Sequence, residues 1–368
     1  MKLVIQSDAR IWGGNEKWLV RVAEGLAGRG HDVLVAGRRG APVASAVSNL
    51  GIRTTHARPG GDGDIARALG FAHMLRREAP DVLLLTAFKK SFWGGWAARR
   101  AGVPRVVERM GIEQGIPPRW KYRYAFRHYI DAMIVNSRVI RDRWLESAPW
   151  YPADEVHVVL NGVTRPTADA STLRAELGIG ADVPVVMTAG RLEHRKGMDV
   201  LIDAFAQAPA NALLVIAGDG PDESALRTRA AQRGIAARAR WLGFRSDLPA
   251  LLAGADVFVL PSRREGMANV VLEAMAAGLL VVTTEVSGAH EAVGAVAGRP
   301  TAGWIVPPGA AAALGVALAE AIAAAGSDAP EVAGMRAEVS WRVDHWFSPE
   351  RMVLETERVL LGATERAG

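Results

Sequence analysis

Two glutamates, Glu265 and Glu273, have the residue type and spacing best suited to chemistry in this sequence. An apolar run at 257–260 is typical of a strand, so Glu265 is expected on the following loop and Glu273 in the next helix. Eight residues at the helical rise separate two carboxylates by about 12 Å, the span of a ribose, a diphosphate and one face of a sugar. Between them, free N–H groups of the helix N-terminus near 268–270 would bind an anion. The alternative is a surface helix with a dipole-favoured carboxylate and a capping or ion-paired Glu273.

A basic loop at 189–197 is the second chemical signal, and it follows an expected strand at 185–189. Arg191 and Lys196 lie five residues apart, so at a strand's carboxyl end they can clamp a diphosphate. Arg191 would bind in a bidentate manner and Lys196 as a point charge, whereas His194 is expected to be only a neighbour. The alternative is a solvated basic loop.

A glycine pair, Gly13 and Gly14, follows the first expected strand and opens the first helix. Without side chains there, a phosphate or a sugar can approach the backbone closely. Glycine pairs also serve as plain turns, so this signal is weak by itself.

The elements that would position these residues alternate between apolar runs of strand length and helical stretches, as in βαβ units. Turn residues at 161–166 separate two such series. We therefore predict two doubly wound parallel-sheet domains, 1–164 and 165–348, with ligands at the carboxyl ends of the strands, in the cleft between domains. Strands are expected at 3–6, 32–36, 82–86, 106–109, 133–136, 157–160, 185–189, 213–217, 257–260 and 280–284. Helices are expected near 15–28, 64–77, 92–101, 118–128, 138–147, 197–207, 222–233, 268–277 and 310–325.

The amino-acid composition and charge limit the classes of function that this protein can have. The 368 residues are 49% hydrophobic and 23% charged, as in a globular protein, and contain no cysteine, which excludes disulfides and thiolate nucleophiles. No apolar run has the length of a signal peptide core or a membrane span, so a cytoplasmic protein is expected. Residues 1–164 hold 25 Lys+Arg and 15 Asp+Glu, whereas the remainder hold 19 and 24. This basic front half indicates an anionic partner: phospholipid headgroups, a phosphorylated acceptor or nucleic acid.

Taken together, these motifs resemble the retaining GT-B glycosyltransferases of the group 1 (glycogen synthase-like, family 4) type. The most specific element is the Glu265-x7-Glu273 motif in its frame 261–276. The segments 30–33, 161–163, 189–197, 217–221 and 242–243 stand where that family carries its other motifs. The segment 346–352 resembles the start of the family's last helix, so the C-terminal helix, about 349–368, would pack back on the front domain.

The resemblance implies a role for each matching residue. Arg191 and Lys196 would hold the diphosphate of a nucleotide-sugar donor, Glu273 the ribose hydroxyls, and Glu265 the transferred sugar. Catalysis would rest on stabilising the departing diphosphate and on positioning, without a protein nucleophile, metal or cofactor. The other implied donor-binding residues are Gly13, Gly14, Gly190, Gly218, Leu242, Gly243, Phe244, Gly266, Met267, Ala268, Asn269 and Val270.

One position departs from the family's pattern. Many members carry a histidine at the end of a front-domain strand, just before a glycine, where this chain has Met110. Glu108, Arg109 or Glu113 would then supply the polar contact on the acceptor side. Because of Met110, a non-catalytic nucleotide-sugar-binding protein on the same fold is the alternative function.

Two further features have plainer interpretations. Asp62-Gly63-Asp64 has the form of a metal-binding DxD motif, but Asp64 is expected to cap the following helix. Aromatic and basic residues interleave at 89–96 and 119–128, which suits either an anionic membrane surface, with a lipid-linked or lipopolysaccharide-type acceptor, or ordinary core packing. No nucleic-acid module is present, and no G-x-G-x-x-G opens the first helix as in dinucleotide oxidoreductases.

Overall fold

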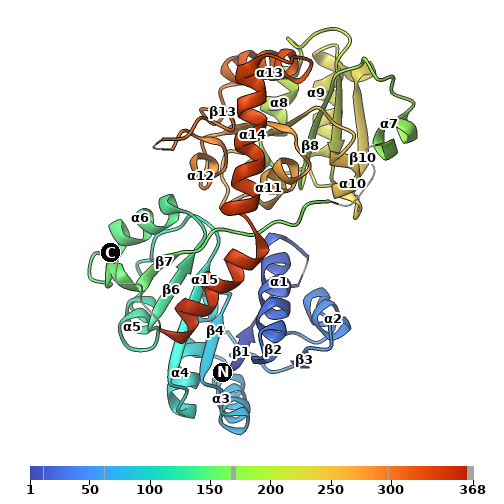
Figure 1. The fold of residues 1–368 in the computed structure, drawn as a ribbon. Coiled ribbons are helices and arrows are strands. Elements are labelled where there is room, and N and C mark those ends of the chain that lie inside the picture. Colours follow the sequence, from blue (N-terminus) through green and yellow to red (C-terminus); the bar gives the residue numbers. More distant parts are fainter. Residues whose placement is uncertain (11, 62, 167–170, 297, 363–368) are drawn as a thin grey trace. The chain divides into compact units, whose positions relative to one another are not determined.

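The computed structural model describes residues 1–10, 12–61, 63–166, 171–296 and 298–362. The chain divides into two compact units (Figure 1). Unit 1 comprises Met1–Gly162 and Pro349–Gly368, and unit 2 comprises Val163–Ser348. Of the C-terminal segment 349–368, residues 363–368 lie outside the described residues.

Unit 1 is built on a parallel seven-stranded sheet in the order β3-β2-β1-β4-β5-β6-β7. Helices cover both faces, which is why its strands are apolar runs rather than alternating patterns. The strands are β1 Lys2–Gln6, β2 Asp32–Ala36, β3 Arg53–Thr55, β4 Val82–Leu85, β5 Arg105–Met110, β6 Ala132–Val135 and β7 Val156–Val158. The helices are α1 Gly14–Gly28, α2 Pro42–Asn49, α3 Ile65–Glu78, α4 Ser91–Ala101, α5 Trp120–His128, α6 Arg138–Ser147 and α15 Pro349–Leu361, with short 3-10 turns η1 Phe88–Lys90 and η2 Ala153–Glu155.

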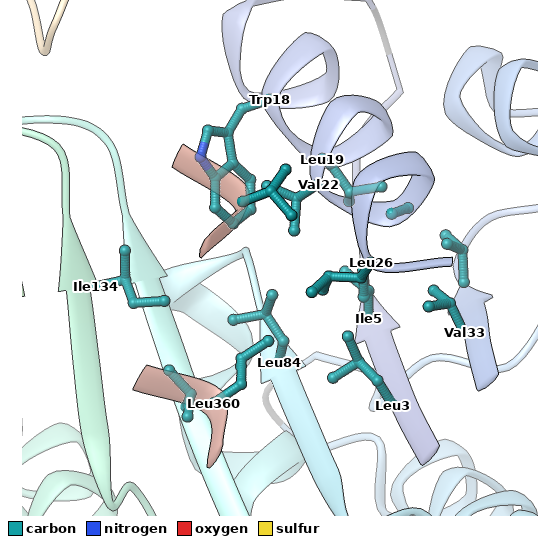
Figure 2. Close-up of a cluster of buried hydrophobic side chains, with 14 of the residues drawn as sticks. Leu3, Ile5, Trp18, Leu19, Val22, Leu26, Val33, Leu84, Ile134 and Leu360 are labelled. Atoms are coloured by element: carbon teal, nitrogen blue, oxygen red, sulfur yellow. The ribbon is translucent and has the colours of Figure 1, made fainter. Parts of the chain in front are cut away.

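The C-terminal helix α15 belongs to the core of unit 1. Leu360 lies with Leu3, Ile5 and Trp18 in one buried apolar cluster (Figure 2). The backbones of α1 and α15 lie so close that a Cβ on Gly25 would come within 2.4 Å of the Val353 side chain. A second apolar cluster, on the other face of the sheet, includes side chains of α3, α4, α5 and α6.

Unit 2 is built on a parallel six-stranded sheet in the order β10-β9-β8-β11-β12-β13. The chain order reverses between β8 and β11, and a sheet of this kind binds ligands at that switch point, beyond the carboxyl ends of its strands. The strands are β8 Val185–Ala189, β9 Leu213–Ala217, β10 Ala239–Gly243, β11 Val257–Leu260, β12 Leu280–Thr284 and β13 Gly303–Val306. The helices are α7 Ser171–Leu177, α8 Met198–Phe205, α9 Glu223–Gln232, α10 Leu248–Leu252, α11 Asn269–Ala276, α12 Ala289–Val293, α13 Ala311–Ala325 and α14 Pro330–His345, with 3-10 turns η3 His194–Lys196 and η4 Ala236–Arg238.

The predicted α/β class and its parallel sheets are confirmed, and the differences concern elements with weak patterns. The strand expected at 157–160 lies at Val156–Val158. Strands β3, β10 and β13 and helices α2, α7, α10, α12 and α14 were not predicted. Strand β10 is only half-buried and contains Arg240, because it lies at the edge of its sheet and lacks the apolar run of a central strand.

No single helix within the described residues has the length and apolar character needed to cross a bilayer. Helices α13 and α14 satisfy that test only as a pair bent by 97°.

Candidate nucleotide-sugar site

At the switch point of unit 2, the loops after β8, β9 and β11 lie against one another. The N–H of Leu192, after β8, donates to the carbonyl of Asp219, after β9 (2.7 Å). The N–H of Arg263, after β11, donates to the carbonyl of Arg195 (2.8 Å). These bonds join the predicted basic loop to the segment that carries Glu265.

Two glycines in the left-handed region permit this close approach. A Cβ on Gly197, at φ +66°, would lie 2.0 Å from the carbonyl oxygen of Pro261. A Cβ on Gly218, at φ +142°, would lie 1.9 Å from the carbonyl oxygen of Gly190. Any side chain at either position would therefore push two loops of the site apart.

Glu265 is buried at the end of β11 and is held by cations of the basic loop. Its Oε1 accepts hydrogen bonds from Lys196 Nζ and from Ser262 Oγ, the latter at 3.0 Å. Its Oε2 lies 3.5 Å from Arg195 Nη1. Two residues singled out from the sequence, Glu265 and Lys196, thus form an ion pair, although 69 positions separate them.

Arg191 lies on the same loop but is exposed. Its Nε is 3.6 Å from Glu193 Oε2, and Glu193 also pairs with Arg195 Nε at 2.6 Å. Because exposed ion pairs contribute little stability, the Arg191 guanidinium can leave Glu193 for an incoming anion at little cost.

A second ion pair, which was not predicted from the sequence, holds the basic loop in place. Arg263 Nη1 and Nη2 donate to the two carboxylate oxygens of Asp199 at 2.8 and 2.7 Å. Arg263 Nη1 also donates to the carbonyl of His194. These hydrogen bonds from Arg263 lower the pKa of Asp199, despite its partial burial. Arg263 stands inside the predicted motif, but nothing in the local sequence indicates a partner 64 positions away.

Helix α11 begins at Asn269, in agreement with the N-terminus expected near 268–270, and Ala268 is its N-cap residue. Ala268, Asn269 and Val270 are half-buried, whereas Gly266 and Met267 are buried. Glu273 lies one turn into the helix and is 8% exposed. The first turn of α11 lies at the same end of β11 as Glu265, so the positive end of the helix dipole adds positive potential there.

The end of β10 supplies a less buried edge to this region. The N–H of Gly218 donates to the carbonyl of Gly243 at 2.7 Å, which links the loop after β9 to β10. Leu242 is half-buried and Phe244 is 70% exposed, so an apolar ring is presented to solvent at this edge.

In unit 1, the candidates on β5 face opposite sides of the sheet. Arg109 is 4% exposed, lies 4.1 Å from the ring centre of Trp18, and donates to Asn15 Oδ1 and Asn161 Oδ1. Burial lowers the pKa of Arg109 to about 9, although the nearby carboxylate of Glu16 opposes the shift. Arg109 therefore connects β5 to the start of α1, directly beside Gly13 and Gly14.

Met110 and Glu108 occupy the other face of β5. Met110 belongs to an apolar cluster and is 3% exposed, and Gln114 Nε2 lies 3.5 Å from its sulfur. Glu108 is fully buried, so both side chains lie in the interior of unit 1. Glu113 is half-buried in the loop beyond the strand.

Burial raises the pKa of Glu108 well above its ordinary value, and the contact with Ser91 only partly offsets this. Ser91 Oγ lies 2.8 Å from Glu108 Oε2 and 2.7 Å from the carbonyl oxygen of Phe88. The Ser91 hydroxyl has one proton. When Glu108 is protonated, its O–H donates to Ser91 Oγ, and the Ser91 hydroxyl donates its own proton to the carbonyl of Phe88.

We therefore expect Glu108→Gln to stabilise unit 1 at pH 8. The pKa of Glu108 is higher in the folded state than in the unfolded state, where it is about 4.3. The stability that the neutral carboxyl contributes is therefore fully present below the unfolded pKa, and it is lost as the pH rises through the folded pKa. The variant should gain unfolding free energy at pH 8 and nothing at pH 4, as measured by urea denaturation. Exposed Glu24 provides the control, because Glu24→Gln should leave the pH profile unchanged. A gain that is equal at both pH values would contradict the buried, protonated carboxyl.

The structure also shows what Asp64 of the DxD-like motif does. Asp64 caps α3, since its carboxylate accepts from the N–H of Arg67 at 3.2 Å, as predicted. Asp62 lies outside the described residues. Within the described part of the chain, no group of three or more His, Asp or Glu side chains could hold a metal ion.

The interleaved aromatic residues divide between core and surface. Phe126 is buried in the apolar cluster beneath α5, whereas Trp120 is 73% and Tyr124 44% exposed. The core-packing interpretation therefore holds for part of the segment 119–128 only.

Known proteins resemble both units. Residues 169–335 match the family model of the glycosyl transferases group 1, and residues 13–162 match that of the glycosyl transferase 4-like domain. The lipopolysaccharide core biosynthesis glycosyltransferase LpsE of Rhizobium meliloti is 33% identical over 288 residues, which are 75% of this chain and 77% of LpsE. Alpha-maltose-1-phosphate synthase of Mycolicibacterium smegmatis is 35% identical over 244 residues, 59% of this chain and 62% of that protein.

Among solved structures, Anabaena Alr3699/HepE in complex with UDP has a TM-score of 0.84 at 22% identity. The match covers 98% of this chain and 100% of HepE. With the two Rossmann-like parallel sheets, this likeness shows the GT-B fold class expected from the sequence.

Proposed function

Because the chain belongs to the glycosyl transferases group 1 family, we propose that it moves a hexose-type sugar from a nucleotide-diphosphate sugar to an acceptor with retention of anomeric configuration. UDP is the proposed nucleotide, supported by the fold's likeness to HepE, which was crystallised with UDP. The proposed acceptor is a glycan, lipid-linked or lipopolysaccharide-type molecule, supported by the similarity to LpsE. In this proposal the reaction needs no metal and no cofactor.

The observation that carries the proposal is the convergence of unlike charges at the switch point of unit 2. Arg191, Lys196 and the first turn of α11 are suited to the diphosphate, because cations and the positive end of a helix dipole attract phosphate oxygens. The carboxylates of Glu265 and Glu273 are suited to hydroxyl groups on either side of that diphosphate. An anion site flanked by two carboxylates matches a sugar–diphosphate–ribose sequence better than it matches a free anion.

The other donor residues have proposed positions along the same ligand. Gly190, Gly218 and Gly266 let the diphosphate approach the backbone, and Met267–Val270 border it at the start of α11. The exposed edge at Leu242, Gly243 and Phe244 borders the base.

The proposed chemistry requires no covalent intermediate with the protein. The bond between the sugar's anomeric carbon and the diphosphate oxygen breaks, and the acceptor hydroxyl forms a bond on the same face of the sugar. The acceptor's proton passes to the departing diphosphate, whose developing charge Arg191 and Lys196 stabilise. Preorganised charge and positioning supply the rate enhancement, so no triad is needed.

We expect Arg191→Ala to weaken UDP binding by about 10- to 100-fold, because a charge-assisted hydrogen bond contributes about 1.5–3 kcal/mol. The measurement is thermal shift with UDP, GDP and ADP, each with and without EDTA, since binding to the folded state raises the melting temperature. Arg233→Ala is the matched control, because Arg233 is similarly exposed but directly follows the last residue of α9, paired with Asp203. Unchanged UDP affinity in Arg191→Ala would remove the phosphate clamp from the proposal.

The proposal includes peripheral contact of unit 1 with an anionic membrane. It is supported by exposed Trp120 and Tyr124 beside Arg119, Lys121 and Arg123, since aromatic rings and cations together favour a lipid interface. The vesicle titrations described next test this contact.

A further inference from the structure

The carboxyl edge of the sheet in unit 1 contains a basic cavity that the donor site does not use. Its volume is about 500 Å³, and Lys89, Lys90, Arg119 and Lys121 contribute to its lining. The described lining residues include no acidic side chain. A cavity of this size with four converging cations favours an anionic ligand.

Three separate segments build the cavity, each following the carboxyl end of a different strand. Gly61 follows β3, the lysines lie in η1 after β4, and Arg119 follows β5. In doubly wound sheets, ligands bind beyond this end of the strands. The cavity therefore occupies a position where the fold binds substrates.

Lys90 forms a fixed wall of the cavity, whereas two other cations are exposed. Lys90 Nζ donates to the carbonyl of Gly60 and lies 3.5 Å from Asp8 Oδ2, and its side chain is 12% exposed. Tyr122 is buried behind it, 4.9 Å from the ring of Phe88 and 5.0 Å from Lys121 Nζ. Lys89 and Arg119 are exposed, so their positive charges lie at the solvent side of the cavity.

Asp8 does not neutralise this edge of the unit. Its carboxylate is shared by Arg38 at 3.0 Å, Arg58 at 3.4 Å and Lys90 at 3.5 Å. One negative charge among three cations leaves an excess of positive charge directly beside the cavity.

An aromatic groove adjoins the cavity and shares Arg119 and Lys121 with it. The groove has a volume of about 660 Å³ and is lined by Phe92, Trp93 and Trp120 among others. These rings pack edge to face, with centroids 5.2 Å apart for Phe92 and Trp93 and 5.6 Å apart for Phe92 and Trp120. A molecule whose anionic group lies in the cavity can therefore lay a ring or an apolar chain along the groove.

We propose that this cavity binds a phosphate group carried by the acceptor, and that the adjoining groove holds the part of the acceptor next to that phosphate. The inference rests on the proposed function and narrows its acceptor to a phosphate-bearing molecule. Phosphate suits the cavity because it offers several oxygens to cations that arrive from different segments. The phosphate can belong to a soluble sugar phosphate or to a lipid headgroup.

The test uses the full-length protein and the double variant Lys89→Gln/Arg119→Gln. Tryptophan fluorescence is followed during titration with glucose 6-phosphate, with glucose, and with phosphatidylglycerol or phosphatidylcholine vesicles. We expect the double variant to bind glucose 6-phosphate or phosphatidylglycerol vesicles at least about tenfold more weakly than the unchanged protein. Response to the sugar phosphate alone assigns a soluble acceptor, and response to the anionic vesicles alone assigns a lipid.

The matched control is Arg76→Gln/Arg77→Gln, which removes the same charge from the last turn of α3, outside the cavity and the groove. Both side chains are exposed, and Arg76 Nη2 donates to the carbonyl of Arg100 at 2.8 Å. An equal loss of binding in both double variants would overturn the inference, because it would indicate non-specific attraction. Binding of neither phosphate probe to the unchanged protein would overturn it as well.

Thermal shift with UDP separates this inference from the proposed function. The Lys89→Gln/Arg119→Gln variant should keep the UDP shift of the unchanged protein, because neither residue belongs to unit 2. A UDP shift without phosphate binding overturns the phosphate subsite and leaves the transferase standing. Phosphate binding without any nucleotide shift would count against the transferase itself.

Discussion

Glu265→Gln is expected to lower kcat for sugar transfer by about 10²- to 10³-fold, the cost of removing one preorganised electrostatic contact to a transition state. Glu265 lies at the end of β11 and accepts hydrogen bonds from Lys196 and Ser262. Glutamine keeps the size and one acceptor of the side chain but removes its charge. The proposed contact with the transferred sugar would then be lost in the step where the sugar separates from the diphosphate.

Donor affinity should respond differently from turnover. Without the carboxylate, Lys196 loses its counter-charge and attracts the donor diphosphate at least as strongly as before. We therefore expect unchanged or tighter UDP binding by thermal shift, together with the collapse of turnover in a donor-consumption assay. This combination also separates an enzyme from a non-catalytic nucleotide-sugar-binding protein.

The control for this variant is Glu223→Gln, which removes a carboxylate from α9 in the same unit. Glu223 pairs with Arg227 one turn away on the helix surface, and such pairs contribute about 0.3–0.5 kcal/mol. Activity of the control should match that of the unchanged protein. Full transfer activity in Glu265→Gln would show that the carboxylate has no part in the reaction.

Arg342→Met should destabilise unit 2 by about 3–5 kcal/mol, the usual cost of breaking a buried ion pair from one side. Arg342 is fully buried on α14 and donates to Glu338 Oε1 at 2.7 Å. It also donates to the carbonyls of Ala292 (3.1 Å), Gly294 (2.8 Å) and Pro300 (2.8 Å). Methionine fills similar space but leaves these acceptors without a donor, so α12 and the segment after it lose their anchor to α14.

Urea denaturation followed by circular dichroism measures this loss, and its pH dependence identifies the cause. Burial raises the pKa of Glu338, but hydrogen bonds from Arg299 and Arg342 outweigh it and lower the pKa overall. The stability from Glu338 is therefore present above the unfolded pKa and is lost as pH falls through the folded pKa. The deficit of the variant should shrink in acid.

The matched control is Arg143→Met, because Arg143 and Glu146 form an exposed pair on α6. Its removal should change the unfolding free energy by less than about 1 kcal/mol. A similarly small effect of Arg342→Met would contradict the anchoring role of that residue.

Local patterns in the sequence were sufficient for the α/β class and for most strands. Central strands such as β8 and β11 are buried on both faces, so their apolar runs stand out without knowledge of their neighbours. Edge strands such as β10 and β3 are short or half-exposed, and nothing local distinguishes them from loops. The cap at Asp64 was also predictable, because its partner is the N–H three residues ahead.

The candidate site shows the same division between local and distant information. Residue type and spacing were sufficient to single out Glu265, Glu273, Arg191 and Lys196, since each lies at a strand end or in the helix that follows. Their pairing was not predictable, because Lys196 and Glu265 meet only where the sheet order reverses between β8 and β11. The bracing of the basic loop by Arg263 and Asp199 has the same origin.

What the sequence by itself determined is the family, the fold class and the chemical types of the groups at the strand ends. Only the tertiary structure decided that Glu108 and Met110 are buried, that Arg109 joins β5 to α1, and that the basic and aromatic residues of unit 1 enclose a cavity and a groove. The physical reason is that burial and ion pairing depend on which segments the sheets bring together. Those segments are tens of residues apart, and no local periodicity encodes their contact.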